Sequence, residues 1–245
     1  MRHLCLTHVH LDHAGAAGHL AAANPRLRVH VHIDGAPHIA DPERLVSSTR
    51  RTFGDAHDRL WGDVRPVPRD QVHPWSPGDR GPLSWLRAIP TPGHAGHHIS
   101  YLDETDGTLV AGDALGILLD DRAPVHPATP PPGVDVGAWL DTLDRIRSVG
   151  PERAVWTHFG LHDDPVGRAS EFSATLRGFH ARVSEALARG DGAADADALA
   201  FEVEVRDRLR AFLGDEVDRY FDAFAAATDY AGMRRFVRKN PEWRP

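Results

Sequence analysis

The start of the chain restricts its fold most, because a short apolar run passes through a histidine cluster directly into a helical pattern. Residues 3–7 have the composition of a strand, and residues 13–23 (HAGAAGHLAAA) predict a helix that ends before Asn24 and Pro25. Between the two lies the segment THVHLDH, at positions 7–13. A strand that leads straight into a helix predicts an α/β arrangement.

The first 160 or so residues continue to alternate short apolar runs with loops. Further strands are expected at residues 27–33, 83–90, 98–103, 108–112 and 153–157. A helix is expected at 136–149, where apolar residues recur at helical spacing after Asp135 as a candidate N-cap. Strands and helices interleaved in this way predict an α/β sandwich.

From about residue 165 the pattern becomes helical. An apolar stripe at helical spacing is formed by Phe172, Leu176, Phe179, Val183 and Leu187. We expect the segment GDGAADAD (190–197) to break this helix, and shorter helices to follow around 201–213, 218–226 and 232–239. The sequence thus predicts an α/β domain of residues 1–164 and a helical C-terminal extension of residues 165–245. We expect the extension to serve packing or self-association into a homo-oligomer, and to contribute no chemistry.

Composition argues against several classes of partner. The net charge of −7 argues against nucleic acid, because phosphate binding requires a basic surface. No run approaches the roughly 20 apolar residues of a membrane helix, and the N-terminus lacks the layout of a signal peptide. The single cysteine, Cys5, fits a reducing compartment. We therefore expect a cytoplasmic protein that acts on a small molecule.

The segment THVHLDH concentrates side chains that can bind metal. His8 and His10 are two residues apart at the end of a strand, so both side chains point to the same face. Asp12 and His13 follow where the chain turns into a helix. Imidazole nitrogen and carboxylate oxygen are ligands that zinc accepts in sites that remain open to water.

Three further candidate ligands each follow an expected strand. His94 ends the segment TPGH, Asp113 ends LVAGD, and His158 ends VWTH. Because loops at one edge of a sheet converge in space, we expect these side chains to gather near one another.

The order of these motifs, from residue 3 to about residue 160, resembles the metallo-β-lactamase fold hydrolases. The segments HLDHAGAAG, PGHAGHH, TPPP and THFG most resemble uncharacterised bacterial and archaeal members. The resemblance implies an αββα sandwich with a binuclear metal centre at one edge. Carried over by position, one metal would be held by His8, His10 and His94 and the other by Asp12, His13 and His158, with Asp113 between them. The two divalent ions would be zinc in the first place, with iron and manganese also known in the family.

These ligands imply a hydrolase. Two ions sharing a water lower its pKa towards neutrality, and the resulting hydroxide attacks a carbonyl carbon of an ester, lactone, thioester or amide. Asp12 is the expected catalytic residue, because its second oxygen could orient the hydroxide or transfer a proton. Two alternatives remain open: a mononuclear iron enzyme similar to persulfide dioxygenases, and an inactive or incomplete fragment of a hydrolase.

Four further histidines are candidates for outer contacts with the ligands or with the substrate. His97 and His98 follow His94, His162 follows His158, and His126 lies in the proline-rich loop 120–133. Each could equally be satisfied by backbone or water. The tyrosine that assists some lactone-cleaving relatives has no counterpart near the motifs.

The position of the first motif leads to a further expectation. Family members carry several tens of residues before it, whereas this chain has two residues before its first expected strand. We expect the first strands of one sheet to be missing, with Met1 an internal position of a longer natural protein. A chain extended upstream is then expected to be more soluble than this one and to bind about two metal ions.

Overall fold

The computed structural model describes residues 1–158 and 160–245, so Phe159 of the THFG motif lies outside the described residues. The chain forms two compact units, described separately below. The N-terminal unit comprises residues 1–90 and 97–106, and the C-terminal unit comprises residues 91–96 and 107–245. The division of the chain at residue 164 stays a prediction.

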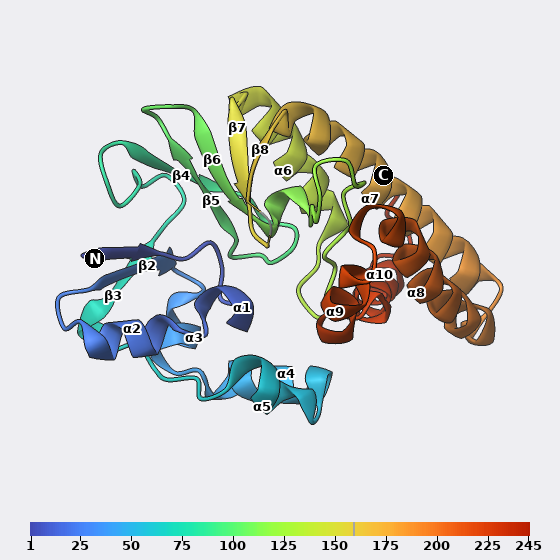
Figure 1. Cartoon of the computed structure of the whole chain (residues 1–245), viewed down its shortest axis with the longest axis horizontal. Coiled ribbons are helices and arrows are strands. Elements are labelled where there is room, and N and C mark those ends of the chain that lie inside the picture. The colour runs from blue at the N-terminus through green and yellow to red at the C-terminus, as the bar shows by residue number, and fades with distance from the viewer. Residues whose placement is uncertain (159) are drawn as a thin grey trace. The chain divides into compact units, whose positions relative to one another are not determined.

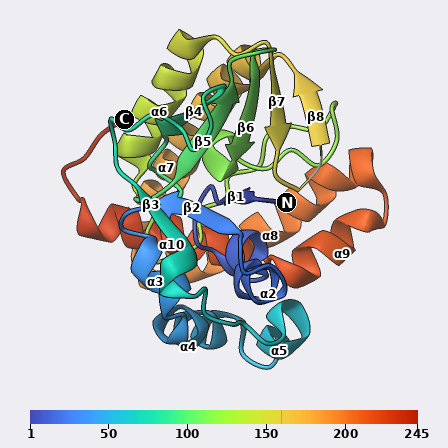
Figure 2. The ribbon, with the colours of Figure 1, turned by 90° about the vertical axis from the view of Figure 1, so that its left-hand side faces the viewer.

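A three-stranded parallel sheet forms the centre of the N-terminal unit. Its strands are β1 (His3–Cys5), β2 (Arg28–His32) and β3 (Val72–Trp75), in that order. The helices α2 (Ala17–Ala23) and α3 (Ala36–Ala40) cover one face of this sheet (Figures 1 and 2). Val29 and Val31 of β2 are fully buried in that layer, in one apolar cluster with Ala21 and Ile39 of the helices.

The other face of the parallel sheet packs on an antiparallel pair of strands. The pair is formed by β4 (Leu86–Pro90) and β5 (Ile99–Asp103). Trp75 of β3 shares an apolar cluster with Ala88 and Tyr101 of the pair, and the Tyr101 hydroxyl donates a 3.0 Å hydrogen bond to the Leu6 carbonyl. Two sheets face to face, with helices outside, give the sandwich that the sequence predicts.

The remaining elements of this unit are short helices. They are α1 (Leu11–Ala14), α4 (Glu43–Phe53), α5 (Ala56–Trp61) and the 3-10 helix η1 (Arg69–Gln71). The helix expected at 13–23 is therefore two helices, α1 and α2, with a turn of two residues between them. The glycine and alanine residues of this stretch allow the break, because they bury little side chain that would hold a continuous helix in place.

The strands of the C-terminal unit are β6 (Thr108–Gly112), β7 (Arg153–Trp156) and β8 (Gly160–Asp163). The strand β7 is parallel to β6 and antiparallel to β8. The helix α6 (Val136–Val149) begins where the Asp135 side chain accepts a 3.0 Å hydrogen bond from the Ala138 amide, as the sequence predicts. Its Trp139 is fully buried, and its ring packs edge-to-face on Phe172 at 5.2 Å.

Four helices form the rest of this unit (Figure 1). They are α7 (Pro165–Ala188), α8 (Asp191–Leu213), α9 (Glu216–Ala223) and α10 (Ala226–Lys239). Phe179 of α7 stacks on Phe201 of α8 with 4.4 Å between ring centroids. No helix in the described part of the chain combines the length and apolarity needed to cross a membrane.

The sequence prediction for residues 190–197 is wrong in one respect. Gly190 has φ of 108° and ends α7, but residues 191–197 form the first turns of the continuous helix α8. Asp191 occupies the first turn of α8, where a negative charge favours the helix, and forms a 3.1 Å ion pair with Arg234 of α10. The alanines that follow have high helix propensity, which offsets the cost of Gly192.

Candidate metal centre

The histidine cluster of the N-terminal unit lies between β1 and α1. His8 Nε2 and His10 Nδ1 are 3.0 Å apart, and the two rings meet edge to face. Two nitrogens on one tetrahedral zinc ion are about 3.3 Å apart, given a Zn–N bond of about 2.0 Å. These two imidazoles are therefore placed as a pair of ligands to a single ion would be.

Asp12 and His13 complete this group from the short helix α1. His13 Nε2 lies 3.2 Å from Asp12 Oδ2, and the His13 ring centroid is 4.1 Å from that of His8. All four side chains predicted from THVHLDH thus gather in one place within this unit. The direct passage from strand to helix is what turns consecutive side chains towards one another.

His97 and His98, which precede β5, lie against the same cluster. The His98 ring stacks on His8 at 4.9 Å. His97 Nε2 accepts a 3.2 Å hydrogen bond from the Val9 amide, between the two histidines of the motif. Because Nε2 of His97 accepts this hydrogen bond, it does not point at an ion. His97 instead holds the backbone of the motif in place.

The C-terminal unit brings together the other three predicted ligands. His94 Nε2 lies 3.2 Å from Asp113 Oδ2, and His158 Nε2 lies 3.9 Å from Asp113 Oδ1. Asp113 and His94 are both buried. The carboxylate therefore places one oxygen near each histidine.

Backbone geometry sets these three positions. His158 has φ of 89°, a left-handed conformation that a non-glycine residue adopts only when its surroundings impose it, and such strain is concentrated at functional sites. Gly93, before His94, has φ of 142° and contacts Trp139 so closely that a Cβ would lie 2.3 Å from the Trp139 Cβ. Asp113 begins the 3-10 helix η2 (Asp113–Leu115) directly after β6.

The second nitrogen of His94 is fixed by a contact that the sequence does not reveal. His94 Nδ1 donates a 2.7 Å hydrogen bond to the Ala128 carbonyl, which leaves Nε2 as the nitrogen available to an ion. The next residue, Thr129, is held by Asp229 of α10, whose Oδ1 accepts from the Thr129 amide at 2.7 Å. The C-terminal extension therefore holds the loop that orients His94.

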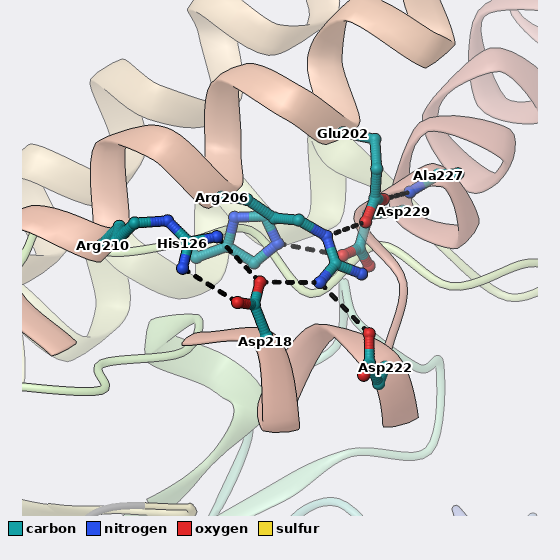
Figure 3. A network of polar contacts seen from close by, with 8 residues as sticks. All are labelled: His126, Glu202, Arg206, Arg210, Asp218, Asp222, Ala227 and Asp229. Atoms are coloured by element: carbon teal, nitrogen blue, oxygen red, sulfur yellow. Dashed lines mark hydrogen bonds and ion pairs between the residues drawn. The ribbon is translucent and has the colours of Figure 1, made fainter. Parts of the chain in front are cut away.

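His126 belongs to this supporting group. Its Nε2 lies 3.0 Å from Asp229 Oδ2 (Figure 3). Its ring centroid lies 6.4 Å from that of Phe201 and 5.4 Å from that of Phe221. Burial raises the pKa of Asp229, and the hydrogen bond from His126 opposes that rise. These contacts place His126 in the interior, where it joins the proline-rich loop to the helical extension.

His162 lies on β8 and is buried. Its Nδ1 is hydrogen-bonded to Asp121, and its ring packs edge-to-face on Trp156 at 5.5 Å. Neither partner is a predicted ligand. His162 therefore joins β8 to the loop at 120–122.

Two aromatic residues near His158 were not predicted from the sequence, Tyr220 of α9 and Phe224, which directly follows that helix. The rings of Tyr220 and Phe224 lie 6.1 and 5.9 Å from the ring of His158. Their spacing of four residues, which places both on one face of a helix, is the only signal in the sequence. The helical extension thus contacts a predicted ligand, contrary to the expectation that it serves packing alone.

The donor set suits a divalent cation such as zinc, iron or manganese. It consists of imidazole nitrogens and carboxylate oxygens, which are the ligands that these ions accept. Cys5 is not part of it, because Cys5 packs in the apolar cluster of Trp75 and burial raises the pKa of its thiol to about 11. The residues present therefore fit a metal centre built from nitrogen and oxygen ligands.

The chain belongs to the metallo-beta-lactamase superfamily, whose sequence model matches residues 1–158. The relative ST1585 from Sulfurisphaera tokodaii, a metallo-beta-lactamase fold-containing protein, is 28% identical over 164 residues, which are 65% of this chain and 60% of that protein. YobT from Bacillus subtilis (strain 168) is 32% identical over 115 residues, 47% of this chain and 46% of that protein. The chain thus spans between about half and three fifths of the length of these curated relatives.

Solved structures agree on the fold. The crystal structure of ST1585 matches with a TM-score of 0.62 at 26% identity, covering 71% of this chain and 67% of that chain. TTHA1623 in a di-iron-bound form matches with a TM-score of 0.50 at 26% identity, covering 69% and 74%. The predicted metallo-β-lactamase fold, with helices at the C-terminal end, is confirmed. All the predicted metal ligands lie within the residues that the superfamily model matches.

Proposed function

We propose that the protein is a binuclear metal-dependent hydrolase that cleaves an ester, lactone, thioester or amide. The observation that supports it most is the position of Asp113, which has one oxygen near His94 and the other near His158. A carboxylate between two candidate histidine ligands in this way can be shared by two ions. In this proposal the four metal-binding side chains of THVHLDH supply the remaining ligands of the two ions.

In this proposal the first ion is held by His8, His10 and His94, and the second by Asp12, His13 and His158. Asp113 joins the two. Bound divalent ions supply the Lewis acidity that activates a water molecule and a carbonyl group. Zinc is the proposed metal, and the di-iron form of TTHA1623 makes iron the first alternative to test.

The residues of the chain have separate tasks in this reaction. His94 is oriented by its Nδ1 hydrogen bond to Ala128, so only Nε2 is available as a ligand. In this proposal Asp12 would hold the second ion through one carboxylate oxygen, and its other oxygen would orient the attacking water or accept its proton and return it to the leaving group. No serine or cysteine nucleophile is required.

The test is hydrolysis of aryl esters, lactones and thioesters by the metal-loaded protein and by Asp113→Asn. We expect the substitution to lower kcat/KM by about 100-fold or more, beyond the 10- to 100-fold typical of residues outside the ligand shell. Asp144→Asn is the matched control, because Asp144 is an exposed carboxylate of α6 that pairs with Arg147. Equal activity in all three proteins would contradict the proposal.

The same preparation separates the alternatives. One iron per chain, with oxygen consumed in the presence of glutathione persulfide, would identify a dioxygenase instead of a hydrolase. A folded protein that binds no metal under any loading condition would identify an inactive fragment.

A further inference from the structure

A cavity in the C-terminal unit lies beside the predicted ligand His158. Its volume is about 490 Å³, and its walls come from the loop after η2, the end of α8 and one face of α9. This volume is within the range of roughly 300–1,000 Å³ that is usual for small-molecule sites. None of the proposed metal-ligand roles assigns a ligand to this cavity.

The walls of this cavity are mainly apolar. They are formed by Leu119, Leu213, Tyr220, Ala223 and Phe224. Two charged residues also line it, Glu216 and Arg219, and they pair with each other at 2.9 Å on the exposed side of α9. Their charges compensate, so the lining offers no net charge to a ligand. An apolar, uncharged group is the occupant that such walls favour.

The wall formed by α9 is fixed to α8 by ion pairs (Figure 3). Arg206 lies 3.3 Å from Asp218 and 3.2 Å from Asp222, and Arg210 forms two contacts of 2.8 and 2.9 Å with Asp218. Beneath them Phe221 is fully buried, with the Arg206 guanidinium 5.6 Å above its ring. Because Phe221 faces inward, Tyr220 and Phe224 are turned to another side of the helix, towards His158.

We propose that this cavity binds the apolar acyl or aryl group of the substrate, with the carbonyl group directed towards His158. The inference rests on the proposed hydrolase function and names the substrate class. Such a cavity would favour esters, thioesters or lactones that carry a long apolar group. Substrates with a small or charged acyl group would bind more weakly. The C-terminal extension then determines specificity, whereas the metal ligands determine reactivity.

Binding of straight-chain carboxylates, which resemble the acyl product, tests the cavity without requiring turnover. Acetate and octanoate are titrated by calorimetry against both metal-loaded and metal-free protein. We expect octanoate to bind more tightly in each, with a gain of at most about fourfold per buried methylene group. In the metal-free protein this preference reports on the apolar walls alone.

Two substitutions that fill the cavity make the test specific. Ala223→Trp is expected to weaken octanoate binding at least about tenfold and to leave acetate binding unchanged, because only the long chain needs the filled space. Ala200→Trp is the matched control, since Ala200 lies exposed on α8 away from the lining. Leu213→Trp repeats the test from α8, in case Ala223→Trp does not fold as judged by its thermal unfolding.

The outcomes separate this proposal from the proposed function. The cavity assignment would be overturned if octanoate bound no more tightly than acetate. It would also be overturned if octanoate bound equally tightly to both filled variants and to the control. Ester hydrolysis without any preference for acyl length would also overturn it and leave the hydrolase intact. Length-dependent binding with no hydrolysis of any ester would support the cavity and overturn the hydrolase.

Discussion

At the scale of single residues, the candidate centre depends on a few backbone positions that allow no larger side chain. Gly93 is the clearest, because its Cα lies against Trp139 just before His94. Substitution to alanine inserts a methyl group where a Cβ would be 2.3 Å from the Trp139 Cβ, so His94 or the helix α6 must move. We expect Gly93→Ala to lower the free energy of unfolding by about 1–3 kcal/mol and to weaken metal binding.

Chemical denaturation and metal titration of Gly93→Ala check this expectation. Gly96→Ala, three residues along the same turn, is the matched control, because a Cβ there meets no atom within 4 Å. The interpretation fails if the two variants have equal stability and equal metal affinity.

Asp229 illustrates a residue that acts on the centre through the backbone. Its carboxylate accepts from the Thr129 amide at 2.7 Å, next to the Ala128 carbonyl that orients His94. We expect Asp229→Asn to weaken metal binding by roughly tenfold, which is at the low end of the effects of residues that support metal ligands. The reason is that the asparagine side chain can keep only part of the contacts that the Asp229 carboxylate makes. Asp222→Asn, an exposed carboxylate of α9, is the control. Unchanged metal affinity in Asp229→Asn, measured by competition with a chelator, would contradict this role.

Some residues of the candidate centre could be predicted from the sequence and others could not. The difference lies in whether local structure or long-range packing positions them. His8, His10 and Asp113 could be predicted because each follows a strand, where a side chain emerges from a sheet edge with a fixed direction. Asp229 and Phe224 lie more than 60 residues beyond the last motif, and only the packing of helices places them there. His97 was foreseen as a neighbour, but its role as an acceptor of the Val9 amide depends on a contact across 88 residues.

At the scale of elements, α9 is a short helix whose position depends on its neighbour α8. It has only eight residues, too few to be stable alone, and therefore depends on its contacts with α8. Arg206 joins Glu202 of α8 to Asp218 and Asp222 of α9. We expect Arg206→Leu to lower the free energy of unfolding by about 1 kcal/mol, with a larger local effect on α9.

Hydrogen exchange of the α9 amides measures the local effect. We expect faster exchange in Arg206→Leu, and faster exchange in the wild-type protein at high salt, because exposed ion pairs are screened. Arg219→Leu is the control, since the described ion pair of Arg219 is with Glu216 on the same helix. Equal protection of α9 in the two variants would contradict a role for Arg206 in fixing this helix.

Prediction at this scale succeeded where the pattern within an element decided the outcome. The helix α6 and its cap at Asp135 follow from apolar spacing and a local hydrogen bond. The helix α8 was not predicted over its full length, because its acidic first turn is stabilised by Arg234 of another helix. A contact between helices far apart in sequence leaves no trace in local propensity.

At the scale of the whole molecule, a row of histidines across the parallel sheet predicts acid sensitivity. His30 of β2 lies between His3 of β1, 2.9 Å away between ring nitrogens, and His73 of β3, with ring centroids 5.4 Å apart. Burial, together with the positive charges of His3, His73 and Arg28, lowers the pKa of His30 to about 4.

The sign of the effect follows from proton binding. Below a pH of about 6.5 the unfolded chain protonates this histidine while the folded protein does not, so stability is present above that pH and is lost as the pH falls towards 4. We expect the metal-free protein to lose stability over this window, and His30→Gln to lose less. His38→Gln is the control, and urea unfolding at several pH values is the measurement. Identical pH profiles for the three proteins would contradict this account.

The number of metal ions bound per chain tests the central claim most directly. Inductively coupled plasma mass spectrometry, after loading with zinc or iron and removal of free metal, gives this number for the wild-type protein and for Asp113→Asn. The proposed centre predicts about two ions in the wild-type protein and at most one in the variant, because Asp113 is the ligand that the two sets share. One ion in the wild-type protein, or two in both proteins, would contradict it.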